Sequence, residues 1–170
     1  AAELTSGCTL ITGGLGGLGL AAAEGLARPG ARLALLGRTP LPAPEEWDGY
    51  LASRDARDRT RRRIEAVRAL EAAGAKVCVV AADVANAVAL KKALETIRDQ
   101  LGQIRGVLHT AGVLDDDLIV LKSAARADKV LQPKVAGTLA LARVLEGSSL
   151  DFFVLYSSVS ATLGLAGQCD

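Results

Sequence analysis

Five short apolar runs, each separated from the next by a helix-length segment, constrain the fold of this chain more than any other feature. The runs are Cys8–Thr12, Arg32–Leu36, Lys76–Ala82, Gly106–Thr110 and Phe152–Ser157. None alternates between polar and apolar residues as a half-exposed strand does. Strands that are apolar throughout are typical of a parallel sheet that is covered on both faces.

The segments between these runs have the spacing of amphipathic helices, and Pro133 is expected to kink or break the last of them. The predicted helices are Leu18–Arg28, Arg61–Ala73, Val88–Leu101 and Ala124–Leu145. Alternation of strands and helices implies βαβ units with right-handed crossovers. The sequence therefore predicts the α/β class, with a Rossmann-like doubly wound parallel sheet of five visible strands in one domain over residues 1–170. Because no helix follows the fifth strand, we expect the C-terminal part of the domain to be missing.

Composition excludes several other classes of protein. The chain has 170 residues, of which 50% are hydrophobic and 23% charged, so wholesale disorder is excluded. A net charge of +1 argues against nucleic-acid binding. Every apolar run is far shorter than the about 18 residues of a membrane span, and Ala1–Gly7 does not resemble the start of a signal peptide. The three cysteines match no metal spacing, so we expect no metal and a reducing, cytoplasmic location.

A glycine-rich segment joins the first predicted strand to the first predicted helix. It consists of Thr12, Gly13, Gly14, Leu15, Gly16, Gly17, Leu18 and Gly19. The pyrophosphate of a dinucleotide needs backbone N–H groups and the positive end of a helix. We expect Gly13 to form the tight turn, Gly17 to let the backbone approach the phosphates, and Gly19 to let the helix pack closely. The alternative is a glycine turn without a ligand, which is disfavoured because so many glycines are costly to order.

The ends of the second and third strands carry further candidate cofactor residues. Arg38 and Thr39 follow the second strand, where an arginine suits the 2′-phosphate of NADP. The alternative for Arg38 is a solvated surface side chain. Asp83, followed by Val84, ends the third strand and would accept a hydrogen bond from the adenine amino group. Asp83 could also, or instead, be the N-cap of the next helix.

Residues 39–60 form an unusually long inserted loop between the second strand and the next helix, and its role has no assignment. The arginine-rich tract Arg54–Arg63 closes it. Nucleic-acid binding is disfavoured for this tract because no aromatic residues interleave the arginines. We expect a solvated helix start or a contact to another domain.

Six motifs occur in order along the chain, followed by the Gly-Gln pair at 167–168. They are TLITGGLGGLG (9–19), LLGR (35–38), AADV (81–84), HTAGVLDD (109–116), PKVAGTL (133–139) and DFFVLYSS (151–158). Together they resemble the ketoreductase domain of modular polyketide synthases, within the short-chain dehydrogenase/reductase superfamily. The resemblance covers nearly the whole chain. It implies that Thr110, Ala111, Gly112 and Ser157 also lie against the cofactor, which is NADPH.

The resemblance also implies catalytic roles. Ser158 matches the serine that hydrogen-bonds the substrate carbonyl, and Lys134 matches the lysine that holds the nicotinamide ribose and lowers the pKa of a catalytic tyrosine. By the family's spacing that tyrosine would immediately follow Asp170, so this chain alone is expected to be inactive. Tyr156 is no substitute, because it matches a strand position that is not catalytic.

Leu114, Asp115 and Asp116 resemble the fingerprint of ketoreductases that yield the D (3R) β-hydroxyl product, and we place them at the substrate groove. Leu163, where the other class has a tryptophan, supports this assignment. Read alone, Asp115–Asp117 could suggest a metal site, but no partner ligands are nearby in the sequence, so a solvated acidic loop is favoured. For His109 we favour a structural or cofactor-packing role over a catalytic base.

The implied function is NADPH-dependent reduction of a β-ketoacyl thioester on an acyl carrier protein to a β-hydroxyacyl group. The implied partners are that carrier protein and neighbouring synthase domains, including a structural ketoreductase half. Two alternatives stay open: a non-catalytic NADP-binding or scaffolding fragment, and a free-standing short-chain reductase of small ketones. The second predicts a lysine four residues after the tyrosine, and the match at Lys134 argues against it.

Overall fold

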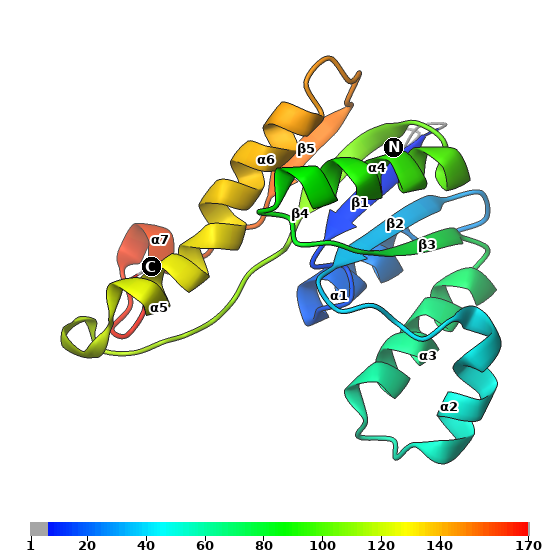
Figure 1. Ribbon diagram of the computed structural model, residues 1–170, viewed down its shortest axis with the longest axis horizontal. Coiled ribbons are helices and arrows are strands. Elements are labelled where there is room, and N and C mark those ends of the chain that lie inside the picture. Colours follow the sequence, from blue (N-terminus) through cyan, green and yellow to red (C-terminus); the bar gives the residue numbers. More distant parts are fainter. Residues whose placement is uncertain (1–6, 170) are drawn as a thin grey trace.

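A computed structural model describes residues 7–169 and contains one five-stranded parallel sheet (Figure 1). The strands are β1 (Cys8–Thr12), β2 (Arg32–Gly37), β3 (Lys76–Ala81), β4 (Ile104–His109) and β5 (Phe152–Leu155). Their order is β3-β2-β1-β4-β5, so the predicted doubly wound sheet is confirmed. The start of the Ala1–Gly7 segment and the expected boundary at Asp170 lie outside the described residues.

The first strand, β1, lies at the centre of the sheet, and later strands are added on both sides of it. The chain runs from β1 through β2 to β3 and then crosses back to place β4 on the other side of β1. The segments that follow β1 and β4 therefore leave the sheet in different directions. In open α/β sheets, ligands bind in the crevice that this reversal opens at the carboxyl ends of the strands.

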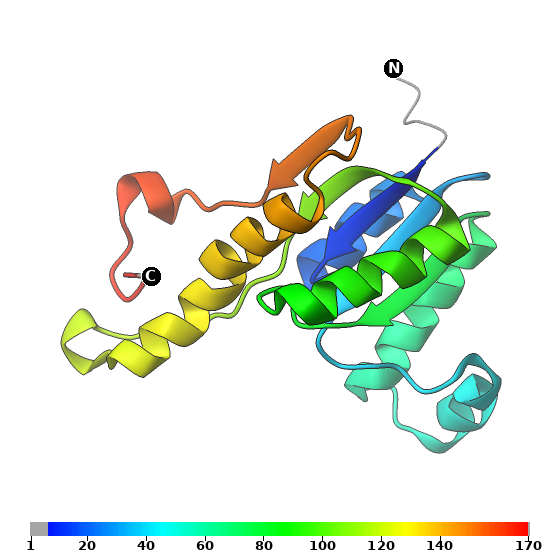
Figure 2. The same cartoon turned by 45° about the horizontal axis from the view of Figure 1, so that its top comes forward.

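Helices cover both faces of the sheet (Figures 1 and 2). Leu10 of β1 packs in a cluster with α4 (Ala87–Leu101) and α6 (Gly137–Val144), whereas its neighbour Ile11 packs on the opposite face. The helices of that second face are α1 (Gly17–Leu26), α2 (Trp47–Ser53) and α3 (Arg59–Ala72). Alternate burial on two faces explains why the central strands β1 and β2 are apolar almost throughout. Among the helices of residues 7–169, none is long and apolar enough to cross a membrane.

The predicted long helix around Pro133 is one continuous helical arm with a local change of pitch. It consists of α5 (Ala124–Leu131), a π-helical turn (Gln132–Ala136) and α6. Proline lacks the N–H that an α-helix needs, and a wider turn accommodates it. The arm extends past the edge of the sheet, and α7 (Ser160–Leu163) lies near its far end (Figure 2). The predicted disturbance at Pro133 is therefore confirmed, as a π turn without termination.

Two predicted strand boundaries were wrong by two residues, and three others by one. β4 begins at Ile104, two residues before the predicted start, and β5 ends at Leu155, so Ser157 and Ser158 follow the strand instead of closing it. The backbone N–H of Tyr156 donates to the carbonyl of His109 (3.1 Å), which is the last bond before the chain leaves the sheet.

Residues 39–60, predicted as a long inserted loop, contain helical structure. They contain a short 3₁₀ turn (Pro44–Glu46) and α2. The indole N–H of Trp47, which is buried, donates to the carbonyl of Pro42 (2.9 Å), and Asp48 pairs with Arg68 of α3 (2.7 Å). The segment is therefore a small helical layer that packs against α3.

Candidate functional site

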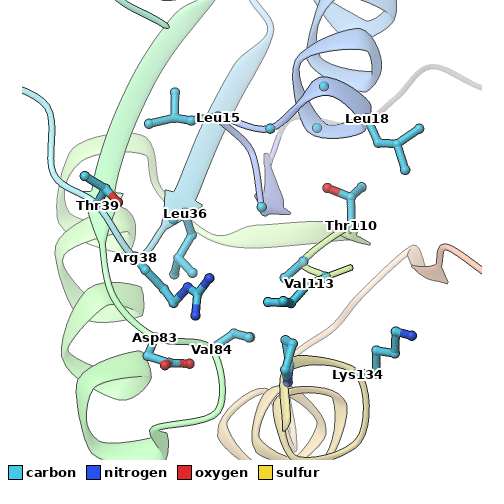
Figure 3. A pocket seen from close by; sticks show the side chains of 18 of the residues that line it. Leu15, Leu18, Leu36, Arg38, Thr39, Asp83, Val84, Thr110, Val113 and Lys134 are labelled. Atoms are coloured by element: carbon cyan, nitrogen blue, oxygen red, sulfur yellow. The ribbon is translucent and has the colours of Figure 1, made fainter. Parts of the chain in front are cut away.

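A cavity of about 600 Å³ lies at the carboxyl ends of the central strands (Figure 3). This is the place between β1 and β4 where the order of the strands reverses. Most of the predicted site residues line it. They are Gly13, Leu15, Gly16, Gly17, Leu18, Gly19, Arg38, Thr39, Asp83, Val84, Thr110, Ala111, Gly112, Leu114 and Lys134. Motifs that are far apart in the sequence thus meet at one cavity, in the position that the doubly wound fold favours for a ligand.

The glycine turn presents bare backbone to this cavity. Gly13 has φ +67°, and a Cβ there would lie 2.9 Å from the backbone nitrogen of Ala111. A Cβ on Gly19 would overlap the carbonyl oxygen of Gly13, so this glycine lets α1 begin directly against the turn. Gly17 borders the cavity and a Cβ there would meet nothing within 4 Å. No side chain caps α1 at Gly16, so its first N–H groups suit an anionic ligand.

Two residues of the glycine segment, Thr12 and Gly14, do not line the cavity and instead bond the turn to the neighbouring strands. The hydroxyl of Thr12 bonds the Nδ1 atom of His109 (2.6 Å), and its carbonyl accepts from the hydroxyl of Thr110 (2.7 Å). The N–H of Gly14 donates to the carbonyl of Leu36 (3.1 Å). These bonds fix the turn to β2 and β4.

His109 is buried, and both of its ring nitrogens have protein partners. Its Nε2 atom lies 3.0 Å from the carbonyl of Pro133, so Nε2 carries the hydrogen and Nδ1 accepts from the hydroxyl of Thr12. Burial lowers the pKa of His109. A neutral ring with both nitrogens occupied ties β1 and β4 to the π turn and is not available as a general base.

Arg38 and Asp83 border the cavity at the ends of β2 and β3. Figure 3 shows the Arg38 guanidinium pointing into the cavity, and it forms no ion pair with any residue of the described part of the chain. Asp83 accepts a hydrogen bond from the N–H of Ala85 (2.9 Å). The predicted N-cap role of Asp83 is wrong, because Asn86 caps α4 through the N–H groups of the helix's first turn.

The structure brings only one of the two predicted catalytic residues to the cavity. Lys134 lines it from the π turn. Ser158 is exposed and shares a hydrogen bond with the hydroxyl of Ser160 (2.7 Å). Neither Ser157 nor Ser158 is among the lining residues, because the chain turns toward α7 after Tyr156.

Comparison with known proteins identifies the family. A family model described as the KR domain matches residues 7–170. The 6-methylsalicylic acid synthase of Aspergillus terreus is 42% identical over 163 residues, which are 94% of this chain and 9% of that protein. A phenolphthiocerol/phthiocerol polyketide synthase of Mycobacterium tuberculosis is 43% identical, with 94% and 8% covered. This chain belongs to the ketoreductase domain family of polyketide synthases.

Solved ketoreductases show the same fold. A ketoreductase domain from the bacillaene assembly line matches with a TM-score of 0.79 and 34% identity, over 95% of this chain and 35% of that chain. The first ketoreductase of the tylosin polyketide synthase matches with a TM-score of 0.75 and 34% identity, over 95% and 31%. This ketoreductase chain thus spans less than a tenth of its curated relatives and about a third of these structures. Domains of this family bind a nicotinamide cofactor.

The acidic loop of the ketoreductase chain is held by a cationic side chain. The Arg126 guanidinium bonds both carboxylate oxygens of Asp115 (2.6 and 3.1 Å) and one of Asp117 (2.6 Å), and these bonds hold the pKa of both carboxyls low. Asp116 accepts from the side-chain amide of Gln168 (3.0 Å). Leu114 lines the cavity, whereas Asp115 and Asp116 do not. Within residues 7–169, no three acidic, cysteine or histidine side chains gather as a metal site.

Several cavity residues were missed by the sequence reasoning. They include Arg59 and Arg63 from the start of α3, and Lys129 and Gln132 from the helical arm. Their helical spacing indicated that Arg59 and Arg63 lie together, because residues four apart share one face of α3. The spacing alone does not say which face meets the cavity.

Proposed function

We propose that this chain provides the cofactor site and part of the catalytic site of a ketoreductase that uses NADPH to reduce a β-ketoacyl thioester on an acyl carrier protein. The product is the β-hydroxyacyl group. One observation carries this proposal: the glycine turn, Arg38 and Lys134 border the same cavity, although they come from three distant parts of the sequence. Family membership supports the reaction class.

The residues of the cavity fit a phosphorylated nicotinamide dinucleotide, which supplies the hydride when it is bound. Bare N–H groups at the start of α1 would hold the pyrophosphate. At one end, Arg38 and Thr39 would bind the 2′-phosphate, and Asp83 with Val84 the adenine. The residues proposed along the nicotinamide half are Thr110, Ala111, Gly112, Lys134 and Ser157, the last of which lies outside the cavity lining.

The chain's own polar groups would handle the substrate oxygen. The Ser158 hydroxyl would donate to the ketone oxygen once it exchanges its present bond to Ser160. The Lys134 ammonium would hold the nicotinamide ribose and favour the ionised form of a nearby phenol. That phenol would be the catalytic tyrosine that the family resemblance implies, and it would transfer its proton to the oxygen as hydride reaches the carbon.

The groove beside Leu114 would receive the acyl chain. Leu114 is 83% exposed and borders the cavity, so an apolar acyl group would bury it. Asp115 and Asp116 would act by fixing this loop, since their carboxylates are bound by Arg126 and Gln168. We propose that this arrangement admits the substrate so that the D (3R) alcohol forms.

The proposed partners are the acyl carrier protein and neighbouring synthase domains, including a structural ketoreductase half. The relatives are long multidomain polyketide synthases, which supports an assembly of this kind. The buried thiols of Cys8 and Cys78 form no disulfide, which supports a reducing, cytoplasmic setting.

The test is reduction of a β-ketoacyl thioester by the full polypeptide that carries this domain, with NADPH and the carrier-bound substrate. We expect NADPH oxidation with a D product, and a loss of roughly 100-fold or more in kcat for Lys134→Ala, in line with the usual size of acid–base contributions. NADPH binding without turnover would favour the non-catalytic alternative. Faster reduction of small free ketones than of the carrier-bound thioester would favour the free-standing reductase.

A further inference from the structure

The arginine-rich start of α3 divides into two groups by what each side chain contacts. Arg61 holds the end of α2, donating to the carbonyls of Leu51 and Arg54 and pairing with Glu65 (2.9 Å). Arg62 donates to the carbonyl of Arg57 (2.9 Å). The remaining members of the α3 start, Arg59 and Arg63, line the cavity and have no carboxylate partner within residues 7–169.

Arg63 touches the glycine turn directly. Its Nε atom donates to the carbonyl of Leu15 (3.3 Å), and its terminal nitrogens have no hydrogen-bond partner in the described residues. Partial burial and the nearby charge of Arg59 lower the pKa of Arg63. Two like charges four residues apart on one helix face repel each other, and partial burial adds to the cost. An anion bound between them would remove this cost.

The position of Leu15 shows which end of the cavity Arg63 serves. In Figure 3, Leu15 lies on the same side as Thr39, whereas Leu18, Thr110 and Lys134 lie on the other side. The hydrogen bond from Arg63 to the Leu15 carbonyl ties Arg63 to the part of the glycine turn that lies on the Thr39 side of the cavity.

We propose that Arg63, with Arg59, joins Arg38 to form a three-guanidinium site for the 2′-phosphate of the cofactor. This inference rests on the proposed use of NADPH. Planar guanidinium groups bind phosphate oxygens in pairs of hydrogen bonds, and the bonds are stronger because both partners are charged. Cofactor choice is then set by two segments, the end of β2 and the start of α3.

The proposal gives the folded 39–58 segment a role. Asp58 caps α3 through the N–H of Arg61 (2.7 Å) and also accepts from the hydroxyl of Tyr50 in α2 (3.3 Å). Arg61 in turn fastens the end of α2. The segment therefore fixes the first turn of α3, where Arg59 is located, and we assign it the task of holding this turn against the phosphate.

The test is calorimetric titration of the chain with two probes, 2′,5′-ADP (adenosine 2′,5′-bisphosphate) and 5′-AMP, which differ only in the 2′-phosphate. For Arg63→Gln we expect the affinity for 2′,5′-ADP to fall about 10-fold or more, as for loss of a charge-assisted hydrogen bond. The affinity for 5′-AMP should change less than about twofold. Arg59→Gln should show a smaller loss of the same kind. The control Arg57→Gln removes an exposed charge of the same tract and should bind both probes as the wild type does.

Three outcomes separate the possibilities. An equal loss for both probes in Arg63→Gln would overturn the proposal, because Arg63 would then hold the Leu15 carbonyl or the pyrophosphate. No loss for either probe would also overturn it. If the wild type itself does not prefer 2′,5′-ADP, the proposed use of NADPH fails instead. Should Arg63→Gln unfold, Arg63→Lys keeps the charge, and a loss confined to 2′,5′-ADP in that variant and in Arg59→Gln supports the site.

Discussion

The two ends of the cavity are built differently. The cofactor end is formed by the glycine turn and the ends of β1 and β2, and its backbone groups are bonded to the buried sheet through Thr12, Gly14 and His109. The proposed substrate end is marked by Leu114, which borders the cavity and is 83% exposed. Its order depends on surface ion pairs and single hydrogen bonds. Changes that disturb the packed backbone of the first end should therefore lower the stability of the fold, whereas changes at the second end should alter local order alone.

The largest effect is expected from a pair of glycine variants at the cofactor end. Gly19→Val should destabilise the fold by roughly 3 kcal/mol, because its side chain would overlap the backbone of Gly13 and Gly14. Gly17→Ala should leave the melting temperature unchanged, because its methyl group meets no protein atom within 4 Å. It should still weaken NADPH binding about 10-fold or more, since the methyl group enters the space proposed for the phosphates.

Thermal unfolding and NADPH titration of both glycine variants check this expectation. Wild-type NADPH affinity in Gly17→Ala would show that the ligand lies elsewhere. A stable Gly19→Val would contradict the packing described at the start of α1.

A smaller and more local effect is expected at the substrate end from Arg126→Gln. The substitution removes the bonds that restrain Asp115 and Asp117, so cleavage by a protease should increase within residues 113–122. NADPH affinity should stay within about twofold of the wild type, because distant sites act independently. Limited proteolysis followed by mass spectrometry measures the first quantity. Arg143→Gln, at the end of α6, is the control, and equal cleavage in both variants would contradict the assigned role of Arg126.

The smallest effect is a pH dependence that comes from His109. Burial depresses its folded pKa below the ordinary value of 6.5, so below that pH the unfolded chain binds a proton that the folded chain resists. Stability is therefore complete above about pH 6.5 and declines as the pH falls from there. His109→Gln should show a flatter melting temperature between about pH 7 and about pH 5, where carboxyl groups stay ionised. Equal slopes in the two proteins would contradict this assignment.

The sequence predicted the parts of the molecule that local chemistry determines. Apolar runs identified the five strands of residues 7–169, because strands at the centre of a parallel sheet are buried on both faces, and the strand–glycine–helix context identified the turn at Gly13. Pro133 marked the π turn because its missing N–H must be accommodated. These features depend on residues that are close in the sequence.

Other features depended on contacts between distant segments and were not predicted. The prolines and charges of residues 39–60 gave no indication of α2 in the sequence. This helix is stabilised by Trp47, which is buried against α3. Arg59 and Arg63 share a helix face, but only the packing of α3 beside Leu15 turns that face to the cavity. Ser158 follows β5 and does not line the cavity, and the sequence of the strand does not indicate where its last bond to β4 falls.

The most direct test of the account is the affinity of the wild-type chain for NADPH compared with NADH, measured by titration under the same conditions. We predict NADPH binding at least about 10-fold tighter, because three arginines line the cavity and would favour the additional 2′-phosphate. Equal affinities, or tighter binding of NADH, would contradict it.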